Sequence, residues 1–218
     1  IGTWYDGSGA NSLNLTEESG TKPDYFTAGY LKLNQGTAVP SSIGLSSQVE
    51  FTQGCTMFFI LQENTALSEW FFYALDNGET SVNKCSLYFR KASGQYFANL
   101  SCNGQLISFY GGDFLPSLEN KTYFAFSWGG SSDETCEWEI IDPNNATYYN
   151  KNEYNAISGG TGIGNIKFKN IGATANSADD ANASMNLYET VIFNKKLTFG
   201  GGQYNRIKNY LLNKHKLN

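Results

Sequence analysis

The sequence CSLYFRKASGQYFANLSCNGQLISF, residues 85–109, contains two dipeptides that favour tight turns, Ser93-Gly94 and Asn103-Gly104. Such two-residue loops join antiparallel strands, and Asn-Gly is the strongest short signal for a hairpin. The runs between these dipeptides are rich in Leu, Ile, Tyr and Phe, which suit pleated strands. The stretch therefore predicts three consecutive antiparallel strands.

The two turns also predict which residues face one another. Counting outward from each two-residue loop gives the partners, and partners share one face of the sheet with the residues two positions away. The opposite face then carries polar and aromatic side chains, among them Tyr88, Arg90, Phe97 and Asn99. The partners on the first, apolar face are Phe89–Ala98, Leu87–Leu100 and Cys85–Cys102 in one hairpin, and Leu100–Ile107 and Ala98–Phe109 in the other.

The composition extends this pattern to the whole chain of 218 residues. Aromatic residues make up 15% and charged residues 16%, with 23 glycines, a mixture that indicates many short strands and turns. One domain of this length buries about 70% of its unfolded surface. We therefore expect residues 1–218 to form a single all-β domain built as a two-sheet sandwich.

The pattern changes after residue 200, where Tyr204, Ile207 and Leu211 recur at helical spacing. This predicts one short amphipathic helix over 202–214 that packs on the sandwich, with a frayed end beyond Lys214. Residues 1–30 are expected to form short strands and loops. The other strands are expected at 30–34, 48–52, 56–62, 70–75, 85–91, 96–102, 105–110, 122–128, 136–141, 164–169 and 184–193.

The net charge of −5 is spread along the chain. No basic stripe is available to neutralise phosphates, so we expect no binding of nucleic acid. No apolar run reaches the roughly 20 residues that cross a bilayer, so we expect no membrane insertion. The start at Ile1 is expected for a mature or excised part of a larger protein.

Four cysteines and one histidine, His215, leave zinc without a ligand set. An even number of cysteines favours disulfides, which form in oxidising compartments. In the hairpin register Cys85 and Cys102 form a non-hydrogen-bonded pair, whose short Cα separation a disulfide spans. We therefore expect an extracellular protein with a Cys85–Cys102 bridge and, by elimination, a Cys55–Cys136 bridge.

Two Asn-x-Ser/Thr sequons are the best candidates for glycosylation. Asn99 lies opposite the apolar face in the hairpin register, so we expect its side chain to reach solvent. Asn145 follows a turn that contains proline.

Short motifs of one known family lie along most of the chain: Asp6–Asn11, Gly29–Leu33, the strands Met57–Leu61 and Tyr123–Trp128, Ile171-Gly172, Glu189 with Val191–Phe193, Leu197-Thr198, and the run from Ile207 to Leu211 with Lys214. They give the chain a resemblance to the LamG-like domains of the concanavalin A-like lectin/glucanase superfamily. It implies a two-sheet antiparallel jelly-roll sandwich with ligands near one rim or the concave face. The superfamily includes glycan binders, adhesion modules, capsid or fibre decorations and glycosidases, so the fold does not choose among these functions.

The candidate glycan-binding residues lie in the Asn- and Tyr-rich segment 144–155, which we expect to be a loop. Sugars stack their apolar faces on aromatic rings and pair their hydroxyls with amides. Tyr and Asn are also typical of adaptable recognition loops. The candidates are Tyr148, Tyr149, Asn152 and Tyr154, whereas the four tryptophans are expected in the core.

The resemblance also implies a Ca²⁺ site near the rim, held by carboxylates and backbone carbonyls. Asp179 and Asp180 are the candidate ligands. The alternative is a pair of solvated carboxylates in a polar loop.

One segment, CEWEIID at 136–142, hints at catalysis. Glu137 and Glu139 would share one face of a strand, as paired catalytic carboxylates must. The retaining glucanases of the superfamily carry Glu-x-Asp-x-x-Glu, but this chain has Glu-x-Glu-x-x-Asp. The shorter acid at Asp142 would not reach a glycosidic oxygen, so we expect no catalytic residues.

The sequence thus predicts a non-catalytic module on a cell or virion surface that binds glycans or mediates adhesion. Its partners would be a glycan or glycoprotein surface and neighbouring domains of a larger protein. Two alternatives stay open: a structural decoration of a capsid, fibre or filament, and a retaining glycosidase.

Overall fold

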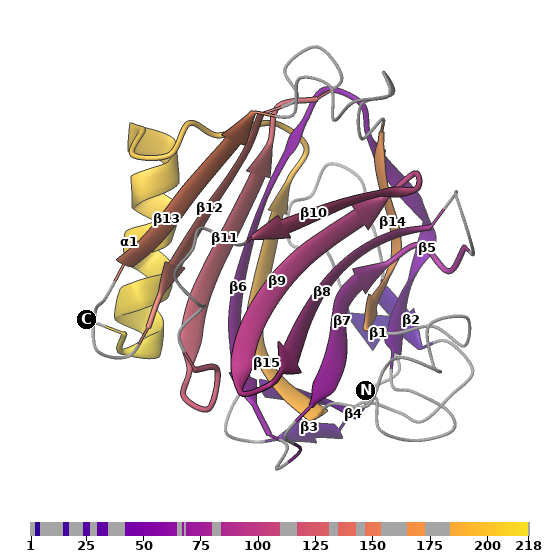
Figure 1. Cartoon of the computed structure of the whole chain (residues 1–218), viewed down its shortest axis with the longest axis vertical. Coiled ribbons are helices and arrows are strands. Elements are labelled where there is room, and N and C mark those ends of the chain that lie inside the picture. The colour runs from indigo at the N-terminus through magenta and orange to yellow at the C-terminus, as the bar shows by residue number, and fades with distance from the viewer. Residues whose placement is uncertain are drawn as a thin grey trace.

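A computed structural model gives the fold (Figure 1). The structure describes residues 3–4, 15–17, 24–26, 30–34, 42–64, 67, 69–79, 84–109, 117–130, 135–142, 147–153, 165–172 and 184–217. Asn145, Tyr154, Asp179 and Asp180 lie outside these residues.

The described strands form two antiparallel sheets, with the order β1-β2-β5-β14-β7-β8-β9-β10 in the eight-stranded sheet and β13-β12-β11-β6-β15-β4-β3 in the seven-stranded one. This confirms the predicted two-sheet jelly-roll sandwich with one C-terminal helix. The elements are β1 Thr3–Trp4, β2 Leu15–Glu17, β3 Asp24–Phe26, β4 Tyr30–Asn34, β5 Ser42–Phe51, β6 Cys55–Glu63, β7 Trp70–Asp76, β8 Cys85–Ala92, β9 Gln95–Cys102, β10 Gln105–Phe109, β11 Thr122–Trp128, β12 Thr135–Ile141, β13 Thr147–Glu153, β14 Ile166–Gly172, β15 Ser184–Phe193 and α1 Gly202–His215.

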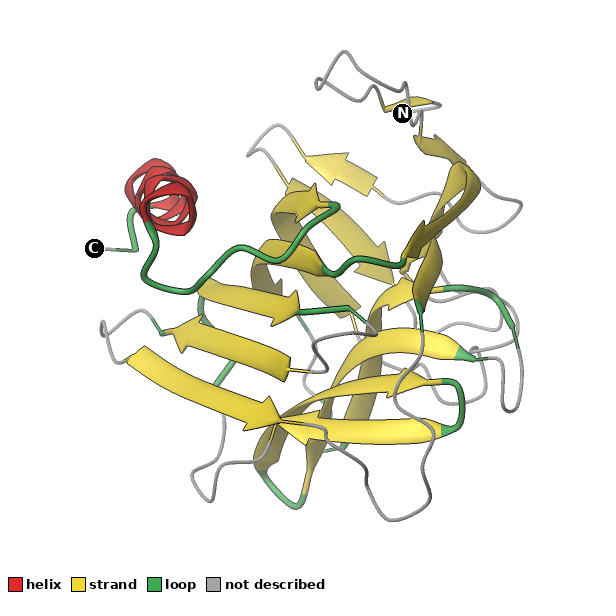
Figure 2. Cartoon of the chain, turned by 90° about the horizontal axis from the view of Figure 1, so that it is seen from above, coloured by secondary structure: helices red, strands yellow, loops and turns green. Residues whose placement is uncertain are grey.

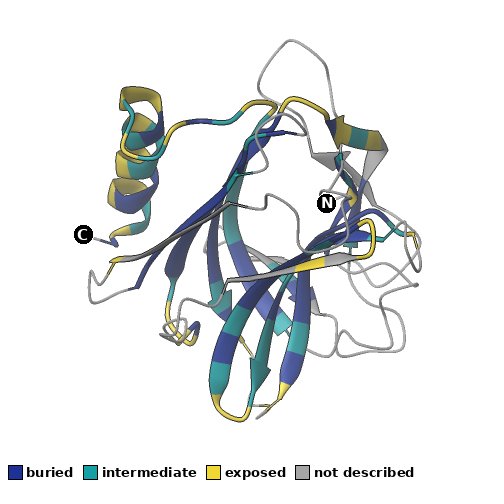
Figure 3. Ribbon diagram, turned by 45° about the horizontal axis from the view of Figure 1, so that its top comes forward, coloured by how far each residue is buried: buried dark blue, intermediate teal, exposed yellow. Residues whose placement is uncertain are grey.

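The main core lies between the two sheets, where aromatic rings from each sheet interlock. Phe89 of β8 meets Phe124 of β11 edge to face, with ring centroids 4.9 Å apart. Trp138 of β12 packs 5.1 Å from the same Phe124 ring. Trp70, Trp128 and Trp138 are at most 1% exposed, as predicted, and Figure 3 shows buried residues along the strands of both sheets.

The predicted register of β8, β9 and β10 is confirmed at every pair. Cys85 lies opposite Cys102, and Leu100 lies between Leu87 and Ile107. Ser93 and Asn103 both have φ of 51°, and each is followed by glycine at 76°, which are the positive angles that a tight hairpin turn of this hand requires.

The two predicted disulfides are absent, because all four cysteines are buried free thiols. The prediction of a bridge between Cys55 and Cys136 was wrong for a geometric reason. Both residues pair with Trp128, one from β6 and the other from β12. Two strand spacings of about 4.8 Å separate their Cα atoms by roughly 9.5 Å, which exceeds the reach of a disulfide.

Cys85 and Cys102 are correctly placed, but their sulfurs have another role. β14 pairs with β7 only at Asn170 and Ile171. Before that point, the Lys167 N–H donates to Sγ of Cys85 at 3.4 Å, and the thiol of Cys102 donates to the Asn165 carbonyl at 3.6 Å. The two thiols thus form hydrogen bonds with backbone groups at the start of β14 and just before it, on the side where β14 does not yet pair with β7.

The helix α1 covers the outer face of the seven-stranded sheet (Figure 2). Tyr204, Leu211 and Leu212 are buried there against Phe58 and Tyr123 in a second apolar cluster. This confirms the predicted amphipathic helix, which extends one residue beyond the predicted range to His215.

The chain beyond α1 folds back, contrary to the predicted frayed end. Lys216 has a left-handed φ of 56°, and its N–H donates to the Asn213 carbonyl at 3.3 Å. The Leu217 N–H donates to the Leu212 carbonyl at 2.9 Å, the pattern of a Schellman cap. Leu217 is only 4% exposed, so the cap buries an apolar side chain.

Candidate functional site

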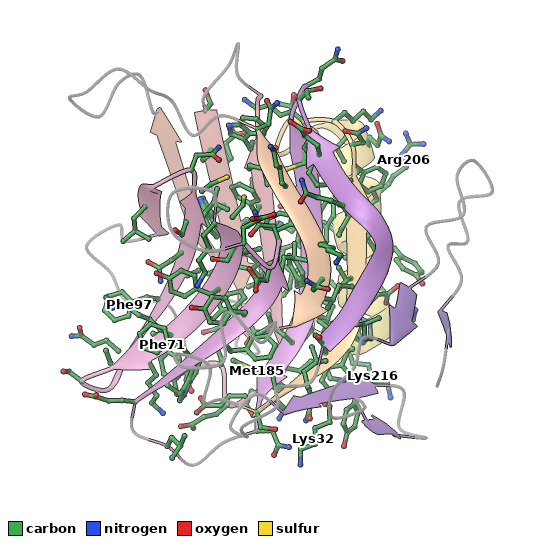
Figure 4. All side chains as sticks on the ribbon, turned by 90° about the vertical axis from the view of Figure 1, so that its right-hand side faces the viewer. Lys32, Phe71, Phe97, Met185, Arg206 and Lys216 are labelled. Carbon is green, nitrogen blue, oxygen red and sulfur yellow. The ribbon has the colours of Figure 1, made fainter. Side chains whose placement is uncertain are left out.

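The outer face of the eight-stranded sheet carries an unusual set of side chains at β7, β8 and β9. Alternation turns Phe71, Tyr73, Tyr88, Arg90 and Phe97 away from the core, since their neighbours Phe72, Phe89 and Ala98 point inward. We call these five outward residues the aromatic face. Figure 4 shows Phe71 and Phe97 close together on this side of the sheet.

Strand pairing arranges the aromatic face in two rows. In one row Arg90 lies between Phe71 on β7 and Phe97 on β9, and its guanidinium carbon is 4.6 Å from the Phe97 ring centroid. In the next row Tyr73 faces Tyr88, with ring centroids 5.3 Å apart. Tyr73 is buried, whereas the other four members are partly exposed. The face therefore offers accessible rings around a cation.

A third outward-facing row, next to these two, consists of buried polar residues. Asn170 of β14 pairs with Asp76 of β7, and Asp76 pairs with Ser86 of β8. All three residues are at most 1% exposed, and the Ser86 hydroxyl has no hydrogen-bond partner among the described residues. Buried hydroxyls are nearly always paired, so this one is a hydrogen-bonding group that remains to be satisfied.

Asn99 faces outward as predicted, but it is not accessible. It lies opposite Tyr88 and is 1% exposed. An amide buried to this extent cannot carry a glycan, so the expectation that Asn99 reaches solvent was wrong. The register fixed the direction of the side chain, but it did not reveal that this part of the outer face is covered.

A buried carboxylate holds the strands of the aromatic face against the other sheet. Glu63, at the end of β6, accepts hydrogen bonds from Nε1 of Trp70 at 2.8 Å and from the Tyr96 hydroxyl at 2.9 Å. Lys91 lies 3.7 Å from the same carboxylate. Burial raises the pKa of Tyr96, and the hydrogen bond to Tyr96 is the main cause that raises the pKa of Lys91. The contacts fix β7, β8 and β9 relative to β6.

The carboxylates considered for catalysis lie on a different face, under α1. Glu139 accepts hydrogen bonds from the Tyr204 hydroxyl at 2.6 Å and from Nζ of Lys208 at 2.8 Å. The Tyr123 hydroxyl donates to that of Tyr204 at 2.9 Å. Glu137 and Glu139 are only 7% and 9% exposed. Glu139 thus anchors the helix, and substrate would have to displace α1 to reach it.

The segment predicted to be a glycan-binding loop is a strand for most of its length. Residues 147–153 form β13, the edge strand that pairs with β12. Tyr148 pairs with Ile140, Tyr149 with Glu139, and Asn152 with Cys136. The prediction missed this strand because Asn and Lys interrupt the run of strand-forming residues.

Among the residues that the structure describes, no three His, Cys, Asp or Glu side chains are grouped as a metal site requires. The same part of the chain holds no helix with the length and apolar character to cross a membrane.

Known proteins resemble this chain in structure and not in sequence. No protein family and no characterised protein matches the sequence. A botulinum neurotoxin type C structure, described as entering cells through two ganglioside molecules, superposes with a TM-score of 0.56 at 13% identity, over 100% of this chain and 51% of that one. The chain spans about half the length of the neurotoxin binding-domain structures that it matches.

Two other similar structures belong to proteins of other kinds, a lectin-like domain and an enzyme. A legume lectin-like domain from Entamoeba histolytica has a TM-score of 0.52 at 8% identity, over 81% of this chain and 89% of that one. An enzymatically active tailspike domain of bacteriophage CBA120 has a TM-score of 0.56 at 14% identity, over 78% of this chain and 26% of that one. Identities this low establish the fold alone. The chain has the jelly-roll fold of the concanavalin A-like lectin/glucanase superfamily.

Proposed function

We propose that the chain is a non-catalytic glycan-binding module of a protein displayed outside the cytosol, on a cell or virion surface. The observation that carries the proposal is the partial exposure of Phe71, Tyr88 and Phe97 on the outer face of a sheet. Exposed rings gathered on one face are a recognised mark of a binding surface. Sugar rings stack on such side chains, and their hydroxyls pair with neighbouring polar groups.

The similar folds support this function without establishing it. They include a lectin-like domain and a neurotoxin whose entry into cells depends on interaction with two ganglioside molecules. The low exposure of Glu139 and its hydrogen bonds to α1 support binding without hydrolysis. The partners would then be a glycan or glycoprotein surface, together with neighbouring domains of a larger protein.

The residues predicted from the sequence for glycan binding define a second candidate binding site. Tyr148, Tyr149 and Asn152 belong to β13, an edge strand of the seven-stranded sheet, whereas the aromatic face lies on the eight-stranded sheet. Tyr154, outside the described residues, follows β13 in the sequence. Ca²⁺ bound by Asp179 and Asp180 is likewise part of the proposal. The experiment therefore has to separate the two locations and the metal.

A glycan array probed with purified variants tests the proposal. We expect Tyr88→Ala and Phe97→Ala to weaken binding by about two- to tenfold each, because a stacked ring contributes roughly 0.5–1.5 kcal/mol. The control is Tyr210→Ala, which removes a ring that is 52% exposed on α1. Loss of binding in Tyr149→Ala alone would move the site to β13. Unchanged binding in EDTA would remove Ca²⁺ from the proposal, and an array without any bound glycan would refute the function.

A further inference from the structure

Arg90 differs from four described lysines in what it contacts. Lys91, Lys167, Lys208 and Lys214 each lie within 4.0 Å of a carboxylate oxygen. Arg90 instead contacts the Phe97 ring, and within the described part of the chain it forms no ion pair with a carboxylate. The aromatic face thus contains a cation whose charge is balanced by no acidic side chain of the described residues.

The partly buried position of Arg90 makes a guanidinium charge without an opposite charge beside it energetically unfavourable. The residue is partly buried between two phenylalanines in its row, and its buried Nε has no hydrogen-bond partner among the residues that the structure describes. A cation–π contact compensates only part of the hydration that a buried guanidinium loses. A carboxylate or sulfate would supply the missing charge and paired hydrogen bonds, because the planar fork of arginine matches both groups.

Lys84 adds a second positive charge beside the same rings. Its Nζ lies 4.7 Å from the Tyr73 ring centroid and 3.3 Å from the Tyr73 hydroxyl. Among the described contacts of Lys84 there is likewise no carboxylate. Tyr73 and Tyr88 form the row next to Arg90. A sugar stacked on Tyr88 would therefore have a cation on either side.

We infer that the aromatic face selects acidic glycans, with Arg90 binding a carboxylate or sulfate group while Tyr88 and Phe97 stack on sugar rings. This inference rests on the proposed function and adds the chemical class of the ligand. Local charge complementarity is needed here, because the chain as a whole carries a net charge of −5 and repels anions at long range. Binding of the acidic ligand should weaken as salt screens the contact.

The test compares three oligosaccharides with the same core: one that ends in a carboxylated sugar, one that is sulfated, and the neutral parent. Calorimetry should show that the wild-type protein prefers at least one acidic form by about tenfold or more, which is about 1.4 kcal/mol. Arg90→Gln should abolish this preference, so that the variant binds the acidic forms no more tightly than the neutral parent. Arg90→Lys should restore part of the preference, because lysine keeps the charge without the fork.

The matched control is Arg206→Gln, which removes the same charge from an exposed position on α1. Equal loss of preference in this variant would overturn the inference, since the effect would then come from net charge. Equal wild-type affinity for acidic and neutral forms would overturn the inference and leave the proposed function intact. Failure of all three sugars, and of every glycan on the array, would overturn both. Thermal unfolding of each variant shows whether Arg90→Gln remains folded, and Arg90→Lys serves as the second variant if it does not.

Discussion

Tyr204 shows how one residue connects the helix to the sheet. Its hydroxyl accepts a hydrogen bond from Tyr123 and donates one to Glu139 in a buried site. We predict that Tyr204→Phe lowers the free energy of unfolding by about 1–3 kcal/mol, because two buried polar partners lose a hydrogen bond. Denaturant unfolding measures this change.

The control on the same helix is Tyr210→Phe. Tyr210 is 52% exposed, so removal of its hydroxyl should change stability by less than about 0.5 kcal/mol. Equal effects of the two substitutions would show that the Tyr123–Tyr204–Glu139 chain contributes nothing. The roles of these residues could not be predicted from sequence, because Glu139 and Tyr204 are 65 residues apart and only the docking of α1 brings them together.

Asn99 and Tyr88 show what a residue pattern predicts and what it omits. The two-residue turns fixed the outward direction of both side chains, and the structure confirms it. Exposure is a different property, since it depends on the rest of the fold. Asn99 is buried whereas Tyr88 is partly exposed, although the two residues face each other. The sequence therefore already contained a signal for the aromatic face, namely the aromatic residues that the hairpin register turns outward.

At the scale of elements, the C-terminal cap should contribute to stability. Removal of residues 215–218 deletes buried Leu217 and the His215 ring, whose Nε2 is 2.7 Å from Oε2 of Glu189. We predict a loss of about 2–4 kcal/mol in the free energy of unfolding, comparable to truncation of a buried leucine. Asn209→Ala, at an exposed position of α1, is the control and should change little. If the truncated protein were as stable as the full chain, the end beyond Lys214 would be frayed, as the sequence predicted, and the cap would contribute nothing.

The cysteines give a second test at this scale. Oxidative refolding with glutathione disulfide would transfer two electrons and two protons from a pair of thiols to the reagent. We predict that the sole intramolecular bridge formed is Cys85–Cys102, since a non-hydrogen-bonded pair brings Cα atoms to about 4.5 Å. Cys55 and Cys136 should be recovered as thiols by alkylation and peptide mapping. A peptide that joins Cys55 to Cys136 would contradict the order of β6, β11 and β12.

Elements with strong turn signals were the most predictable. The strands at 30–34, 122–128 and 184–193 have the predicted bounds, and β8 to β10 have the predicted register. The edge strand β13 was missed because an edge strand needs little apolar alternation, so its residues resemble those of a loop. The pairing order of the sheets depends on contacts between distant segments, which short-range patterns do not encode.

For the whole molecule, buried thiols and phenols predict a loss of stability in alkali. Burial raises the pKa of Cys55, Cys85, Tyr123 and Tyr204 above their ordinary values. The unfolded chain therefore releases these protons first, from about pH 8.5 for thiols and about pH 10 for phenols, so the free energy of unfolding falls as pH rises. Each group contributes a slope of at most about 1.4 kcal/mol per pH unit.

Denaturant unfolding at pH 7.5, 9 and 10.5 checks this slope. Stability should be constant below pH 8 as far as these four groups are concerned, and Tyr123→Phe should make the decline above pH 10 shallower. A stability that does not change up to pH 10.5 would mean that the four groups titrate alike in the folded and unfolded chain.

The central claim is that the aromatic face is the glycan-binding surface of this jelly roll. NMR titration of the labelled protein with the tightest glycan from the array tests it most directly. We predict that the largest shifts fall on Phe71, Tyr88, Arg90 and Phe97, with none at Tyr204 under the helix. Shifts confined to residues 147–153 or to α1 would contradict the claim.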